Sequence, residues 1–157
     1  PTSEEVRALG RAYCGAVALG AREAIAGVRR LGVRVVAISG GLRDAVLPLC
    51  RDLGLADTDV FAVALQWNTR GAYADFDRSS PLTTQDGKAR LLRTLQLPRP
   101  VLAVGDGSTD IAMRSPGAAD AFAAYVGFVR REQVVAAADH IVASFDELLP
   151  IVRALTT

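Results

Sequence analysis

The stretch Pro100–Asp110 reads PVLAVGDGSTD and decides the fold of this 157-residue chain. The apolar run VLAV predicts a buried strand, and the two glycines allow the chain to turn sharply where that strand ends. Asp106 then lies at the carboxyl end of the strand, where open α/β sheets bind ligands. Asp110 falls in the first turn of the next helix, which we expect Ser108 or Thr109 to cap.

Asp106 and Asp110 together suit a hard cation. Mg²⁺ takes oxygen ligands, is often held by one or two carboxylates, and commonly bridges to phosphate. The plainer alternative is a capped turn whose acids only complement the helix dipole. Because such a turn rarely needs both glycines and both acids, we predict a Mg²⁺ site with Asp106 and Asp110 as its ligands.

Lys88 is the only lysine in a chain that contains 17 arginines. It follows Gly87 near the start of a predicted helix, so its position is set by that helix. A site that needs a compact point charge on a phosphate does not accept the planar arginine fork. A lone lysine could also arise by chance, but its presence among so many arginines indicates that Lys88 binds phosphate.

A second apolar run, residues 33–38, precedes Ser39, Gly40 and Gly41. Two backbone amides at the start of a helix, with a serine hydroxyl beside them, form an anion site. By itself this pattern is equally consistent with an ordinary turn. Arg43, in the first turn of the following helix, is a weaker candidate for binding a substrate carboxylate, since it is equally readable as a solvated helix charge.

Length and composition predict one domain over residues 1–157 with an ample apolar core. Net charge is +1, which argues against nucleic acid or an anionic membrane as a partner. No apolar run is long enough for a membrane span. Cys14 and Cys50 are interpreted as buried small side chains in a reducing cytoplasm. The pairs Arg29–Arg30 and Arg130–Arg131 read as solvated helix faces.

Strands alternate with helices along the chain. Helices are predicted over residues 3–13, 21–31, 42–53, 85–95, 130–138 and 146–155, with a short one near 111. Strands are predicted over 33–38, 60–62, 101–104, 121–125 and 140–143, and a β-hairpin over 64–67 and 72–75. This order predicts an α/β fold with a doubly wound, mostly parallel sheet. Ser39 and Asp106 both end strands, so they share one edge of that sheet, and Lys88 must reach across to it.

These motifs resemble the haloacid-dehalogenase superfamily of phosphohydrolases, and in particular its phosphoserine phosphatase branch. Residues 35–41 look like its second motif, 87–88 like the third and 105–110 like the fourth, and residues 71–73, 76–77 and 81–82 are also similar. The resemblance implies a Rossmann-like core and hydrolysis of a small phosphorylated metabolite, phosphoserine or a similar compound, as in cytoplasmic serine biosynthesis.

The resemblance also implies roles for the site residues. Ser39 and the Gly40 amide would hold the phosphoryl oxygens, Lys88 would neutralise them and orient the nucleophile, Asp106 would ligate Mg²⁺, and Asp110 would support the metal shell. In this family an aspartate attacks phosphorus, and water then hydrolyses the aspartyl-phosphate.

The family's first motif, an apolar strand ending in Asp-x-Asp-x-Thr, supplies that aspartate, and we expect this chain to begin too late to contain it or the helical cap. Two sequences imitate the motif, Asp75–Ser79 and Asp57–Asp59, but neither follows an apolar strand. The chain is thus expected to be the carboxy-terminal portion of a phosphatase and inactive alone. The alternative is an inactive relic that binds phosphate or a protein partner.

In the family's sheet the absent strand lies between the strands that end at Ser39 and Asp106. We therefore expect either a gap there or another segment filling it. The candidates for that segment are the absent amino-terminal segment and a homodimer partner.

Overall fold

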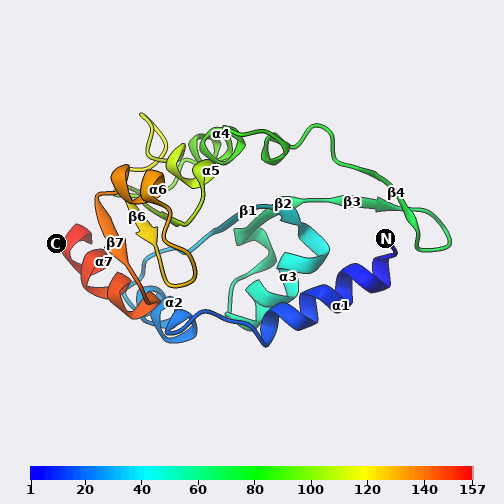
Figure 1. Ribbon diagram of the computed structural model, residues 1–157, viewed down its shortest axis with the longest axis horizontal. Helices are drawn as coiled ribbons and strands as arrows, with labels where there is room; N and C mark the ends of the chain where they lie inside the picture. Colours follow the sequence, from blue (N-terminus) through cyan, green and yellow to red (C-terminus); the bar gives the residue numbers. More distant parts are fainter. Residues whose placement is uncertain (157) are drawn as a thin grey trace.

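The computed structural model describes residues 1–156 as an α/β fold built on parallel strands (Figure 1). One parallel pair joins β1 (Ala37–Leu42) to β2 (Val60–Val63). A second parallel sheet has the order β5 (Leu102–Gly105), β6 (Ala121–Tyr125), β7 (His140–Val142). The predicted hairpin is present as antiparallel β3 (Leu65–Trp67) and β4 (Tyr73–Phe76).

Helices cover the strands and connect them. They are α1 (Ser3–Cys14), α2 (Ala21–Arg30), α3 (Arg43–Asp52), α4 (Gly87–Thr94), α5 (Ser108–Ile111), α6 (Glu132–Ala136) and α7 (Leu148–Thr156). Three short 3-10 turns complete the order: η1 (Asp57–Asp59), η2 (Pro81–Thr83) and η3 (Phe145–Glu147). Within the described residues, no helix is both long and apolar enough to span a membrane.

The side chains of β6 alternate between two apolar layers, as a strand covered on both faces requires. Phe122 and Ala124 pack in a cluster with Leu92 of α4 and Val134 of α6. Ala123 and Tyr125 pack in another cluster with residues of β7 and α7. All five residues of β6 are buried, so the predicted doubly wound arrangement is confirmed for this half of the sheet.

Strand β1 differs from the prediction. The expected strand over residues 33–38 is observed at Ala37–Leu42, because pairing with β2 starts only at Ala37 opposite Val60. The register shifts between Ile38 and Leu42. Ser39 therefore lies inside an irregular strand, and the prediction that it follows a regular strand is wrong.

The expected gap between the two parallel sheets is confirmed. In residues 1–156, β1 is hydrogen-bonded to β2 alone and β5 to β6 alone. Strands β1 and β5 face the same cavity, which lies where a further strand would join the two sheets.

Of the arginines predicted to be solvated, Arg29 is not merely solvated, since it donates to the carbonyl of Gly54. Its long guanidinium reaches this acceptor on a neighbouring segment. Arg130 pairs with Glu132, two residues away, and its side chain stays 53% exposed, as predicted. The cysteine prediction holds for Cys50, whose burial raises the pKa of its thiol, whereas Cys14 is only partly buried.

Candidate active site

The turn after β5 is organised by the carboxylate of Asp110. Asp110 Oδ2 accepts hydrogen bonds from the amides of Asp106 at 3.1 Å and Gly107 at 2.9 Å. Gly107 is the N-cap of α5, so the prediction that Ser108 or Thr109 caps the helix is wrong. The reason is that Ser108 and Thr109 already lie in the first turn of α5, so neither occupies the N-cap position, and the Asp110 carboxylate at the third helical position reaches back to the Gly107 amide instead.

Gly105 makes this arrangement possible. A Cβ atom added at Gly105 would overlap the Asp110 carboxyl group. The backbone of β5 therefore approaches Asp110 more closely than any residue with a side chain would allow.

We predict that Gly105→Ala lowers the free energy of unfolding by about 3 kcal/mol, because the new methyl group forces the buried carboxylate to move. Urea denaturation measures the change. Gly15→Ala is the matched control, since the nearest heavy atom to its added Cβ is 3.5 Å away. Equal stability of the two variants would contradict this account of the turn.

Lys88 and Asp110 form a nearly buried ion pair. Lys88 Nζ donates to Asp110 Oδ1 at 2.6 Å, with side-chain exposures of 17% and 9%. Gly87 lets α4 begin against η2, because a Cβ there would overlap the carbonyl of Pro81. Lys88 binds Oδ1 of Asp110, whereas the turn amides bind Oδ2. One carboxylate therefore fixes the position of Lys88 relative to the turn after β5.

Ser39 and Asp106 both line the cavity between β1 and β5, and their predicted joint role in phosphate binding stays a prediction. The Ser39 hydroxyl accepts a hydrogen bond from the Gly41 amide at 3.0 Å. Gly40 and Gly41 are exposed. The segment Ser39–Gly41 therefore presents a hydroxyl and accessible backbone amides on the β1 side of this cavity.

Arg131 is a site residue that the sequence analysis missed. Its Nη1 donates to Asp106 Oδ2 at 2.5 Å and to the Asp106 carbonyl at 2.7 Å. Reading it as a solvated helix charge is therefore wrong. The available signal was its place shortly after β6, whose carboxyl end adjoins that of β5.

Arg43 does not join this group. Its guanidinium donates to the carbonyl of Val60 and, at 3.0 Å, to that of Asp57. Both acceptors lie at the amino end of β2, away from the carboxyl edge where Asp106 sits. The structure thus ties Arg43 to backbone carbonyls, and its predicted contact with a substrate carboxylate remains untested.

The carboxylate of Asp106 fits a magnesium ion as one ligand of an incomplete ligand set. Asp106 offers a half-exposed carboxylate, with 51% of the side chain accessible. Asp110 has both oxygens engaged and supports the turn. Within residues 1–156 no three acidic, histidine or cysteine side chains cluster closely enough to hold a metal. Mg²⁺ usually keeps several waters and takes one or two protein carboxylates plus substrate phosphate.

The two motif-like acids are engaged elsewhere. Asp75 lies in the hairpin, and its hydrogen bond to Arg78 lowers the pKa of its carboxyl group. Asp57 precedes β2, and Arg51 lowers the pKa of its carboxyl group in the same way. Neither follows an apolar strand, as the sequence analysis expected.

The fold defines the class as an α/β domain on parallel strands, with Asp106 and its polar neighbours in the turn at the carboxyl end of β5. A sequence profile of the haloacid dehalogenase-like hydrolases matches residues 5–115. The chain belongs to that family.

Its relatives and structural neighbours include phosphoserine phosphatases. The chloroplastic phosphoserine phosphatase of Arabidopsis thaliana is 33% identical over 133 residues, covering 83% of this chain and 45% of the plant protein. A phosphoserine phosphohydrolase-like protein from Francisella tularensis superposes with a TM-score of 0.85 at 25% identity, over 96% of this chain and 70% of that one.

A structure titled as a phospho-aspartyl intermediate analogue of phosphoserine phosphatase has a TM-score of 0.67 at 25% identity, covering 85% of this chain and 63% of that chain. The chain spans between 45% and 67% of the length of the phosphoserine phosphatases it matches.

Proposed function

We propose that this chain is the phosphate- and metal-binding part of a Mg²⁺-dependent phosphomonoester hydrolase of the phosphoserine phosphatase type. The observation that carries the proposal is the Lys88–Asp110 ion pair, held beside Asp106 at the edge that Ser39 shares. The nucleophilic aspartate lies outside this chain, and the reaction passes through an aspartyl-phosphate. The phospho-aspartyl analogue among its structural neighbours supports this route.

Each residue has a distinct task in the proposed reaction. Ser39 Oγ and the Gly40 amide donate hydrogen bonds to the phosphoryl oxygens, and the Lys88 ammonium balances their negative charge. Asp110 positions Lys88 through the 2.6 Å contact. Asp106 would hold Mg²⁺, which supplies positive charge that stabilises phosphoryl transfer.

Phosphate release from phosphoserine tests the proposal. The 157-residue chain and a protein extended through its upstream coding sequence are compared with and without Mg²⁺. We expect Mg²⁺-dependent release only from the extended protein. Turnover by the 157 residues alone, abolished by Asp75→Asn, would instead show that Asp75 is the nucleophile.

Ser39→Ala is predicted to lower kcat/KM of the extended protein about tenfold to a thousandfold, because one donor to the phosphoryl group is lost. Steady-state kinetics on phosphoserine measure the loss. Ser79→Ala, an exposed hydroxyl bonded to Asp77 after the hairpin, is the matched control. Identical kinetics for the two variants, with native circular dichroism, would reduce Ser39–Gly41 to an ordinary turn.

A second candidate is a phosphate-binding relic without turnover. The pairing of Asp106 with Arg131 favours it, since it already neutralises the carboxylate assigned to the metal. Phosphate binding by calorimetry, with no release of phosphate from phosphoserine by the extended protein, would support this candidate.

A further inference from the structure

Arg131 binds Asp106 at two points through a single nitrogen. Its Nη1 donates to Asp106 Oδ2 at 2.5 Å and to the Asp106 carbonyl oxygen at 2.7 Å. The two residues come from different βα connections, since Asp106 follows β5 and Arg131 is the N-cap of α6, which follows β6. The contact therefore ties both the main chain and the side chain of Asp106 to the neighbouring connection.

The backbone of Arg131 is itself fixed. Its carbonyl accepts hydrogen bonds from two amides of α6. Four residues earlier, Gly127 lies so close to Tyr125 and Ala143 that an added Cβ atom would overlap both of them. The loop between β6 and α6 is thus anchored at both ends, and the Arg131 side chain reaches Asp106 from a fixed base.

One oxygen of Asp106 is left over by these contacts. The Asp106 amide donates to Asp110 Oδ2 at 3.1 Å, and the Asp106 carbonyl and Oδ2 both accept from Arg131. Within residues 1–156, no hydrogen bond or ion pair reaches Asp106 Oδ1. Because half of this side chain is exposed, Oδ1 is the atom that remains for a cation.

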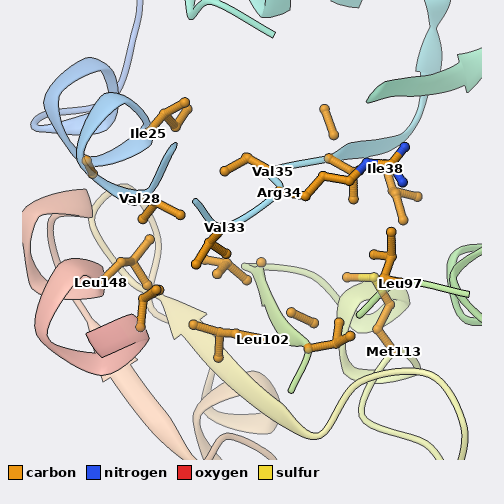
Figure 2. A pocket seen from close by; sticks show the side chains of 18 of the residues that line it. Ile25, Val28, Val33, Arg34, Val35, Ile38, Leu97, Leu102, Met113 and Leu148 are labelled. Atoms are coloured by element: carbon orange, nitrogen blue, oxygen red, sulfur yellow. The ribbon is translucent and has the colours of Figure 1, made fainter. Parts of the chain in front are cut away.

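The cavity that Asp106 also lines supplies no competing charge. Of the described residues, the arginines that line it are Arg34 and Arg99. Arg34 binds Asp59, and the other lining side chains labelled in Figure 2 are apolar. Arg99 binds Asp120. No cationic side chain of the cavity is therefore available to the Asp106 carboxylate.

A guanidinium beside a metal-binding carboxylate can act in two ways. It can orient the carboxylate, as hydrogen-bonding partners of metal ligands commonly do, or it can take the place of the cation and compete with it. Arg131 engages Oδ2 and leaves Oδ1. Its side chain and that of Asp106 are 41% and 51% exposed, so water weakens the repulsion between the guanidinium and a cation. Both observations favour orientation over competition.

We propose that Arg131 is a positioning residue for the cation site, which fixes the Asp106 carboxylate through Oδ2 so that Oδ1 is presented to the cation. This inference rests on the Mg²⁺ site of the proposed function and adds to it a residue from outside the sequence motifs. Fixing a half-exposed side chain in advance removes part of the ordering cost of binding. Loss of Arg131 should therefore weaken cation binding without unfolding the chain.

Binding of Mn²⁺, which accepts the same oxygen ligands as Mg²⁺, tests the proposal without turnover. Electron paramagnetic resonance measures the Kd of Mn²⁺ for the extended protein and two variants. Arg130→Met is the matched control, because Arg130 lies on the same loop but pairs with Glu132. We expect the Kd to rise at least about tenfold in Arg131→Met and to stay unchanged in Arg130→Met.

Two results of this titration would overturn the proposal. An unchanged Kd in Arg131→Met would show that its contact with Asp106 is an ordinary surface ion pair. Tighter Mn²⁺ binding by Arg131→Met would show that the guanidinium competes with the cation instead of orienting its ligand.

Arg131→Lys separates positioning from a merely structural role. Both hydrogen bonds come from one nitrogen, so an ammonium can supply the same charge and donors without the planar fork. We expect Arg131→Lys to recover most of the Mn²⁺ affinity that Arg131→Met loses, and the urea midpoints of both variants to match that of Arg130→Met. A midpoint that falls in step with the affinity would show a structural role and contradict the proposal.

The same measurements separate this inference from the proposed function. If the unchanged protein binds Mn²⁺, Asp106→Asn weakens that binding and Arg131→Met does not, the metal site is retained and the positioning role is wrong. If the unchanged protein shows no saturable Mn²⁺ binding, the metal site and the positioning role are both wrong.

Discussion

Lys88→Met is expected to lower the free energy of unfolding by about 3–5 kcal/mol, because it leaves the Asp110 carboxylate buried without its cation. Asp110 is 6% exposed in total, so water cannot replace the lost ammonium. The turn amides of Asp106 and Gly107 still bind the other oxygen. These amides do not replace the hydrogen bond and positive charge that Lys88 supplies to Asp110 Oδ1.

A double-mutant cycle measures this interaction. Urea denaturation of Lys88→Met, Asp110→Asn and the double variant is expected to give a coupling energy of about 1–3 kcal/mol. Arg11→Met is the control, since Arg11 pairs with Glu4 on the surface and such pairs contribute about 1 kcal/mol or less. Similar losses for Lys88→Met and Arg11→Met would contradict the importance of burial.

Activity provides the second measurement on the same residue. In the extended protein, Lys88→Arg is expected to lose at least about a hundredfold in kcat, since a planar fork cannot occupy a site that holds an ammonium 2.6 Å from Asp110. Near-normal turnover by Lys88→Arg would show that the lone lysine is an accident of composition.

Asp106→Asn is expected to raise the Mg²⁺ concentration needed for half-maximal activity of the extended protein at least tenfold, or about 1.4 kcal/mol. The amide keeps the shape of the side chain and removes the charge that a hard cation requires. Its effect on stability should be small, because the Asp106–Arg131 pair is about half exposed.

Asp52→Asn is the matched control for Asp106→Asn. Asp52 is also ion-paired with an arginine, Arg22, but it lies at the end of α3 rather than at the β5 turn. We expect its Mg²⁺ titration to match that of the unchanged protein. An unchanged titration for Asp106→Asn as well would remove Asp106 from the metal site.

The sequence by itself determined the elements whose signals are local. The apolar run of residues 121–125 predicts β6 with its observed bounds, because all five positions are buried whichever face they occupy. The hairpin followed from turn residues between two short alternating runs, and Asn68 indeed accepts hydrogen bonds from the amides of Arg70 and Ala72. The glycines of the Asp106 turn predicted a sharp turn, and the structure adds that Asp110 packs closely against Gly105.

Only the tertiary structure decided where β1 begins, because a strand is defined by its partner, and residues 33–36 border the cavity between β1 and β5 instead of a neighbouring strand. The same holds for the arginines. Arg131 reaches Asp106 across 25 residues of sequence, while Arg43 turns to carbonyls near the start of β2. A long guanidinium pairs with whichever acceptors the fold brings within reach, and no local pattern in the sequence encodes that choice.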